Sequence, residues 1–289
     1  ACLVGSEMGI RDRHKVVGLA RSEASARALE AAGAEVHRGS LDDPESLRAG
    51  AAKADGVIHL AFIHDFSRFA DSIRADTRAI EAMGAVLEGS QRPLVIAAGL
   101  LGLAPGRIAV ETDVAAPAGR GASEATMLAL AERGVRTSIV RLSPTVHGKG
   151  DHGFVPHLIA SARQKGVSVY IGDGASRWPA VHRSDAARLF RLALERAPAG
   201  SRLHAAAEEG VPTRDIANVI GRRLGVPVAS KRPEEAGDFV GFLGHFFALD
   251  APASSTLTRE QLGWRPVEPG LLADLDDEHY FAPDAGTVL

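Results

Sequence analysis

The stretch GASEATMLALAERGVRTSIVRL, residues 121–142, joins two different hydrophobic patterns within one short segment. Its first part, residues 121–134, has the pattern of an amphipathic helix and stops at Gly134, a residue type that commonly ends helices. Its second part, residues 135–142, is a β-branched apolar run typical of a buried strand. A helix that leads directly into such a strand indicates an α/β protein with a parallel sheet.

The same alternation continues toward the N-terminus. One predicted helix begins after the capping residue Ser22, another has Pro44 in its first turn, and a long helical stretch covers residues 65–89. The whole pattern predicts a doubly wound parallel sheet with helices on both faces, whose central strands lie at residues 15–20, 34–38, 56–61, 93–98 and 135–142.

After Ser143 the chain becomes rich in glycine, proline and histidine. A helix at 155–166, a strand at 167–172, a loop at 173–182 and a helix at 184–197 are predicted there. We expect a smaller lid that closes over the carboxyl edge of the sheet, where ligands bind in open α/β folds. The predicted domains are a core of 1–145 with parts of 175–205, a lid of 146–175 and 206–280, and a mobile tail at 281–289.

Composition excludes several classes of protein. The 289 residues are 45% hydrophobic and 24% charged, and the formal net charge of −3 offers no basic footprint for nucleic acid or an anionic membrane. No apolar run approaches the ~20 residues of a membrane span, and the N-terminal stretch is too short and polar for a secretory signal. The single Cys2 excludes an intramolecular disulfide framework and predicts a cytoplasmic protein.

Five segments in order carry a family resemblance: VVGLARS (16–22), GSLDDPESL (39–47), DGVIHLAF (55–62), VRTSIVRLSPTVHGKGD (135–151) and WPAVHRSDAARL (178–189). Together they resemble an extended or atypical short-chain dehydrogenase/reductase of the NAD-dependent epimerase/dehydratase type. The resemblance runs from residue 15 to residue 275. It implies a Rossmann-like fold and an NAD(P)-dependent oxidoreductase or epimerase/dehydratase that acts on a small carbonyl or hydroxyl substrate.

The first strand–helix unit departs from that family. Its members begin with a strand, a GxxGxxG turn and a full helix, which hold the dinucleotide pyrophosphate. Here only Gly5 and Gly9 are available, and a crossover needs at least ~10–12 residues, almost the whole interval between Gly5 and Val16. We interpret the first unit as missing or replaced; the alternative is a genuine but shortened phosphate loop.

The remaining cofactor site is better preserved. Arg21 and Ser22 follow the second family strand, where a guanidinium can pair with a 2′-phosphate; this favours NADP, with NAD also possible. The alternative is that Arg21 is a solvated residue at a helix start. The resemblance implies further cofactor contacts at Ser40, Leu41, Leu60, Ala61, Phe62, Ala97 and Pro144, although residues 60–62 also fit a plain sheet core.

The catalytic dyad of the superfamily is absent. Its reductases use a Tyr acidified by a Lys four residues later, because proton transfer needs a phenolate near neutral pH. The only tyrosines here are Tyr170 and Tyr280, and no lysine occurs between Lys53 and Lys149. No Tyr-x-x-x-Lys motif can therefore lie between the fifth and sixth family strands.

Asp76 is the first candidate to replace that dyad, because it falls where the family has a supporting Asn. It could act as a general acid or base if burial raised its pKa. The alternative is a surface Asp paired with Arg74 or Arg78. Ser123 and Glu124 lie where the dyad belongs and are interpreted as a helix cap and a first-turn acid.

The histidine-rich loop offers a second set of candidates. His147 could donate a proton in the cleft, and Trp178 and His182 lie where the family lines its substrate side. A metal site made of His147, His152 and His157 is disfavoured, because a spacing of five matches neither a helix face nor a strand face.

Two functions remain open at this point. The first is an NAD(P)(H)-dependent oxidoreductase or epimerase with a rearranged proton donor. The second is a catalytically silent NADP(H)-binding sensor or interaction protein. The expected partner is a small-molecule substrate, not nucleic acid or a membrane, and the helices at 65–89 and 121–134 suggest a homodimer of the family's usual kind.

Overall fold

The computed structural model describes residues 14–63 and 68–282 of the chain. The candidate phosphate-loop residues Gly5 and Gly9, together with Cys2, lie outside the described residues. The same holds for the predicted mobile tail from residue 283 onward.

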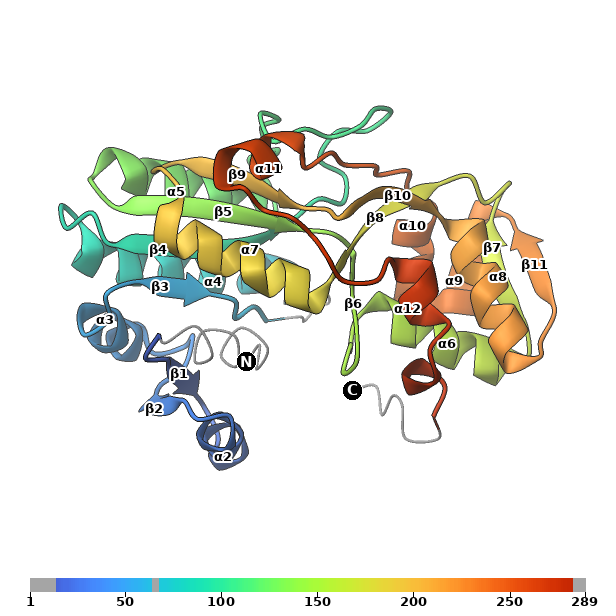
Figure 1. Cartoon of the computed structure of the whole chain (residues 1–289), viewed down its shortest axis with the longest axis horizontal. Coiled ribbons are helices and arrows are strands. Elements are labelled where there is room, and N and C mark those ends of the chain that lie inside the picture. Colours follow the sequence, from blue (N-terminus) through green and yellow to red (C-terminus); the bar gives the residue numbers. More distant parts are fainter. Residues whose placement is uncertain (1–13, 64–67, 283–289) are drawn as a thin grey trace.

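The main sheet has four parallel strands in the order β3 (Val57–His59), β4 (Pro93–Gly99), β5 (Arg136–Leu142) and β9 (Ser201–Ala205). The bounds of β3, β4 and β5 were predicted to within two residues. The order is that of a parallel sheet whose connections run through helices, as Figure 1 shows. The predicted α/β fold class is confirmed.

Helices cover both faces of this sheet. α3 (Pro44–Ala52), α4 (Phe69–Leu87) and α5 (Gly121–Glu132) pack on one face, and α7 (Arg183–Arg196) packs on the other. Successive residues of β4 therefore alternate between the two cores, as the period of a strand requires. Leu94 and Ile96 join the α4 and α5 core and Val95 joins the α7 core, all three with 1% exposure or less.

α4 and α5 approach each other closely because of one glycine. A Cβ atom added to Gly84 of α4 would lie 2.4 Å from Leu130 Cδ1 of α5. The missing side chain of Gly84 lets Leu130 pack directly against α4, in the C-terminal halves of the two helices.

The N-terminal unit forms a separate small sheet. β1 (Val17–Ala20) and β2 (Glu35–Arg38) pair in parallel and are linked by α2 (Glu23–Ala31), whose N-cap Ser22 accepts a hydrogen bond from Ser25 N at 3.1 Å. Among the described residues no strand pairing joins β1 or β2 to β3. The expected single sheet is thus two parallel pieces, and the segment predicted to be abnormal, residues 1–13, lies outside the described range.

The C-terminal half contains a second set of elements, which we call the smaller lobe. β7 (Ser168–Ile171) pairs in parallel with β11 (Val228–Lys231). Around them pack the helices α6 (Phe154–Lys165), α8 (Thr213–Leu224), α9 (Ala236–Val240), α10 (Gly244–Phe247) and α12 (Leu271–Leu275) (Figure 1), with the short 3₁₀ turns Pro233–Glu235, Gly241–Leu243 and Glu278–Tyr280.

One predicted loop is wrong. Residues 177–182 form β8 (Arg177–His182), which lies between β6 (Thr145–His147) and β10 (Glu208–Pro212). Proline is disfavoured inside a sheet because it donates no ladder hydrogen bond, and Pro179 masked the strand pattern. The strand forms because tertiary packing buries its residues 178–181 completely.

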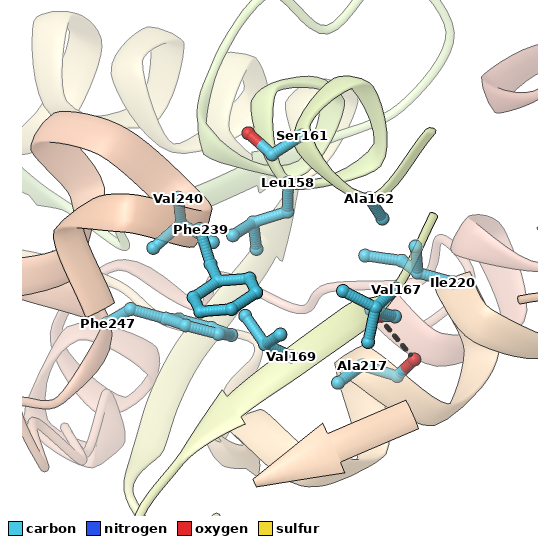
Figure 2. A pocket seen from close by; sticks show the side chains of 11 residues that line it. Leu158, Ser161, Ala162, Val167, Val169, Ala217, Ile220, Phe239, Val240 and Phe247 are labelled. Atoms are coloured by element: carbon cyan, nitrogen blue, oxygen red, sulfur yellow. Dashed lines mark hydrogen bonds between the residues drawn. The ribbon is translucent and has the colours of Figure 1, made fainter. Parts of the chain in front are cut away.

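The core of the smaller lobe holds one cavity of about 10 Å³, lined among others by Leu158, Phe239 and Phe247 (Figure 2). A space of this size holds about one water molecule. The cavity is therefore a small packing gap and offers no room for a substrate.

The C-terminal segment returns to the main sheet. α11 (Thr256–Leu262) ends at Gly263, and Trp264 packs on the α7 core while its Nε1 donates to Asp185 O at 3.0 Å. Across residues 14–63 and 68–282, no helix is both long and apolar enough to cross a membrane.

Candidate active site

Three buried polar side chains meet at the carboxyl edge of the main sheet. His59 is the last residue of β3, and its Nε2 lies 2.8 Å from Asp76 Oδ1 on α4. Ser123 Oγ on α5 donates to Asp76 Oδ2 at 2.5 Å. Asp76 is only 3% exposed, so its interpretation as a surface residue paired with Arg74 or Arg78 is wrong.

The pKa of Asp76 differs from the expectation. Burial raises the pKa of this carboxyl, but the hydrogen bonds from His59 and Ser123 and the nearby Arg120 charge lower it below the usual value. The condition set for Asp76 to act as a general acid or base, a pKa raised by burial, is therefore not met. Asp76 is a carboxylate at neutral pH and acts only as an acceptor, so it fixes the proton of His59 on Nε2.

His59 is the residue that sequence reasoning missed. With Nε2 committed to Asp76, its second ring nitrogen, Nδ1, makes no hydrogen bond to any residue in the described part of the chain. An imidazole oriented by a carboxylate, with its other nitrogen open, is a general base. The available signal was a histidine at the carboxyl end of a predicted strand, the edge where ligands bind.

In the segment expected to hold the dyad, the observed structure differs from the predicted one. Ser123 is not a cap, because Arg120 occupies the N-cap position of α5 and Ser123 is the third helical residue. Glu124 is a first-turn acid but is buried, and its carboxylate receives Arg141 Nε at 2.9 Å and Nη2 at 2.7 Å. Arg120 and Glu124 thus have the four-residue spacing of the missing Tyr and Lys.

A buried network fixes this part of α5 against the sheet. Arg141 of β5 is fully buried, and its Nη2 also donates to Asp113 O at 2.8 Å. Its Nη1 lies 3.3 Å from Nε2 of His204 on β9, while His204 Nδ1 bonds to Ser254 O. Because burial lowers the pKa of His204, that imidazole stays neutral and accepts from the guanidinium.

His147 and His182 form a second group, where β6 and β8 end. His147 Nδ1 lies 2.7 Å from Asp274 Oδ2 on α12, and its ring meets that of His182 edge-on at 5.4 Å. Nε2 of His147 is buried without a hydrogen bond to the described residues. Nearby, Tyr280 Oη accepts from Gly148 N and donates to Asp151.

No metal site emerges from the histidine-rich loop. His157 Nε2 lies 3.3 Å from Val240 O on α9. Within residues 14–63 and 68–282, no group of three or more His, Cys, Asp or Glu side chains could hold a metal ion.

The two residues expected on the substrate side have different surroundings. Trp178 is fully buried in the smaller lobe, where its Nε1 donates to Leu249 O at 3.2 Å and its ring meets Phe247. This gives it a packing role. His182 is half-buried and caps α7, its Nδ1 accepting from Ser184 N at 3.2 Å.

The predicted cofactor residues lie along the carboxyl ends of the strands. Arg21 follows β1, is exposed and has no ion pair or hydrogen bond within the described part. Ser22 is committed to capping α2, and Ser40 Oγ accepts from Asp42 N at 3.2 Å in the turn after β2. An exposed, unpaired guanidinium at this edge fits the 2′-phosphate of NADP.

The other predicted cofactor positions split between core and edge. Leu41 packs partly on the α4 core and Leu60 partly on the α7 core, whereas Ala61 is exposed. Phe62 lies 4.1 Å below the Arg120 guanidinium, and the carbonyl of Ala97 accepts from Arg120. Pro144 lies in the link between β5 and β6.

Comparisons with known proteins agree with this fold. Residues 121–206 match the model of the NAD dependent epimerase/dehydratase family. The chain is 49% identical over 287 residues to the uncharacterized protein C2A9.02 of Schizosaccharomyces pombe, covering 97% of each chain, and 44% identical to YLL056C of Saccharomyces cerevisiae, covering 92% and 91%. The chain belongs to the NAD-dependent epimerase/dehydratase family.

Solved structures show the same fold at low sequence identity. UDP-glucose 4-epimerase from Thermotoga maritima, solved with UDP-glucose, superposes with a TM-score of 0.76 at 17% identity, over 96% of this chain and 95% of that chain. UDP-glucose 4-epimerase from Thermus thermophilus, a complex with NAD, gives 0.72 at 19% identity, over 97% and 96%. Both likenesses show the fold of this chain.

Proposed function

We propose that the chain is an NAD(P)(H)-dependent oxidoreductase or epimerase/dehydratase-like enzyme that acts on a small carbonyl or hydroxyl substrate without a Tyr-Lys dyad. The observation that carries the proposal is the buried group of His59, Asp76 and Ser123 at the carboxyl edge of the sheet. Family membership and the NAD complexes of its structural neighbours support the cofactor class.

His59 moves the proton in this proposal. In the oxidative direction its neutral Nδ1 accepts the hydroxyl proton of the substrate, and in the reductive direction the imidazolium returns a proton to the new alkoxide. Asp76 holds the ring through Nε2 and stabilises the positive charge that forms on it. A bound nicotinamide dinucleotide supplies or accepts the hydride at this edge.

The test is Asp76→Asn, assayed with NADPH and NADH against a panel of carbonyl compounds. The variant keeps the shape of the side chain, so fold and cofactor binding are expected to persist while turnover falls by ~10²–10⁴. Asp71→Asn, an exposed acid on the same helix that pairs with Arg68 and Arg74, is the matched control and retains turnover.

Other outcomes of the same experiment separate the alternatives. Turnover that survives Asp76→Asn and falls with His147→Ala would assign the proton transfer to the second histidine. Tight cofactor binding with no turnover for any carbonyl compound would favour the silent sensor, which the absence of a Tyr-x-x-x-Lys motif also favours.

The choice of NADP over NAD is assigned to Arg21. Because the guanidinium is exposed and unpaired in the described part, removing it loses a charge-assisted bond of about 1.5–3 kcal/mol, roughly 10- to 150-fold in affinity. We therefore expect Arg21→Ala to lower the NADPH-over-NADH affinity ratio by that factor. Arg27→Ala, an exposed change on α2, should leave the ratio unchanged, and an unchanged ratio in Arg21→Ala would refute the assignment.

We also propose that the protein is a cytoplasmic homodimer paired through α4 and α5. The single cysteine supports the compartment and the exposed faces of the two adjacent helices support the pairing. Sedimentation at micromolar concentration tests the dimer, and a monomer would contradict it.

A further inference from the structure

Arg120 lies in the segment where the family has its dyad, and it is a cation with unused hydrogen-bond donors. Arg120 precedes α5, and its backbone is fixed by a tight turn. A Cβ atom added to the next residue, Gly121, would lie 1.8 Å from Ala116 O, so only glycine lets the chain turn there. The turn determines where the Arg120 side chain begins.

Three contacts then hold the guanidinium in place. It lies 4.1 Å over the ring of Phe62, one Nη2–H donates to Ala97 O, and Nη1 stands 3.8 Å from Asp76 Oδ2. The aromatic face and the carbonyl orient the planar fork without neutralising its charge.

Most of the donors of Arg120 remain available. A guanidinium has five N–H donors, and within the described residues only the bond to Ala97 O is made. Asp76 Oδ2 is too far for a hydrogen bond and already accepts from Ser123. The side chain is 28% exposed, so the free donors reach solvent beside the buried His59–Asp76 pair.

The other acid of the segment does not neutralise this cation by direct contact. Glu124, four residues later, is engaged bidentately by Arg141 on the buried side of α5. Arg120 therefore presents a planar, always-charged fork beside the proposed proton-transfer group. Such a fork is the side chain best suited to bind a carboxylate through two parallel hydrogen bonds.

We propose that Arg120 binds the carboxylate of the substrate and that the substrate class is small 2-oxo or 2-hydroxy acids. This inference rests on the proposed function, since it places the carboxylate on Arg120 and the adjacent carbonyl or hydroxyl at His59.

The test uses two probes of nearly equal shape, the carboxylate oxamate and its neutral amide oxamide. Calorimetric titration of the NADPH complex should show tighter binding of oxamate, by about 10- to 150-fold for a charge-assisted contact. Arg120→Gln should remove this preference, Arg120→Lys should restore only part of it, and Arg74→Gln, an exposed change on α4, should retain it. Thermal unfolding confirms that each variant is folded.

Several results would overturn the inference. One is equal binding of oxamate and oxamide by the unmodified protein, and another is a preference that survives Arg120→Gln. A loss of NADPH affinity in Arg120→Gln with unchanged oxamate binding would assign the guanidinium to a cofactor phosphate instead. If oxamate binding depends on Arg120 but neither pyruvate nor pyruvamide is turned over, the carboxylate site stands and only the proposed function is refuted.

Discussion

Two buried histidine–aspartate pairs with nearly the same geometry occur in this molecule. His59 and Asp76 are 2.8 Å apart at the carboxyl edge of the main sheet, and His147 and Asp274 are 2.7 Å apart where β6 meets α12. Distance and burial therefore do not distinguish a proton-transfer pair from a structural one. The two pairs differ in which ring nitrogen of the histidine is not bonded to the carboxylate.

The ring nitrogens that are not bonded to a carboxylate differ in their surroundings. In His59 the remaining nitrogen is Nδ1, on a residue that ends β3 at the carboxyl edge of the sheet, where ligands bind. His147 keeps Nε2, which is buried without a partner in the described part and faces the ring of His182. A nitrogen enclosed in this way does not exchange protons with a substrate, so we interpret the second pair as a tie between the C-terminal segment and β6.

The largest stability effect is expected at the structural pair. Asp274→Ala leaves Nδ1–H of His147 buried and unpaired, which costs about 1–3 kcal/mol in the free energy of unfolding. Asp276→Ala, two residues further on, removes an exposed ion pair with Arg222 and should cost less than about 1 kcal/mol. Denaturant unfolding measures the loss in the free energy of unfolding for both variants. Equal losses would show that the buried pair contributes no more than the exposed one.

The stability of the two sites should also depend on pH in opposite ways, because the pKa of one carboxyl at each site is shifted in a different direction. Because the folded pKa of Asp76 is lowered, its stabilising contribution is present above ~pH 4 and is lost as pH falls through the lowered value. Burial raises the pKa of Asp151 near His147, so its contribution is present at low pH and is lost as pH rises through the raised value.

Unfolding free energies measured across a pH series test these opposite signs. Asp76→Asn should flatten the acid side of the stability profile, and Asp151→Asn should remove part of the decline toward neutral pH. If Asp76→Asn leaves the free energy of unfolding at acid pH unchanged, His59 and Ser123 do not hold the carboxylate in its charged form.

The smallest effect is expected for Ser123→Ala. The variant removes one of two hydrogen bonds to Asp76, worth about 1 kcal/mol, and leaves the bond to His59 in place. Turnover should fall by up to about tenfold, and the loss of stability at acid pH should become smaller, because the folded pKa of Asp76 moves toward its unfolded value. A drop as large as that of Asp76→Asn would make Ser123 itself the proton donor.

The sequence was sufficient to predict the fold class, because the strands at β4 and β5 are long apolar runs buried on both faces. The short β1 was predicted too, although its Val17 is 53% exposed. β8 was missed because Pro179 and the surrounding turn residues hide a strand that only its neighbours stabilise.

The site was predicted in part. Position alone pointed to Asp76, but its partners come from residues 17 and 47 positions away in the chain. The direction of its pKa depends on those partners, so no local pattern could give it. The same holds for Arg120, whose neighbours Phe62 and Ala97 belong to other elements.

The most direct test of the account is turnover measured side by side for His59→Gln and His147→Gln with NADPH and the same carbonyl panel. Glutamine can still donate a hydrogen bond to the carboxylate but cannot carry a proton through a ring nitrogen. The account predicts a loss of ~10²–10⁴ for His59→Gln and unchanged turnover for folded His147→Gln. Full turnover in His59→Gln, or an equal loss in both variants, would contradict it.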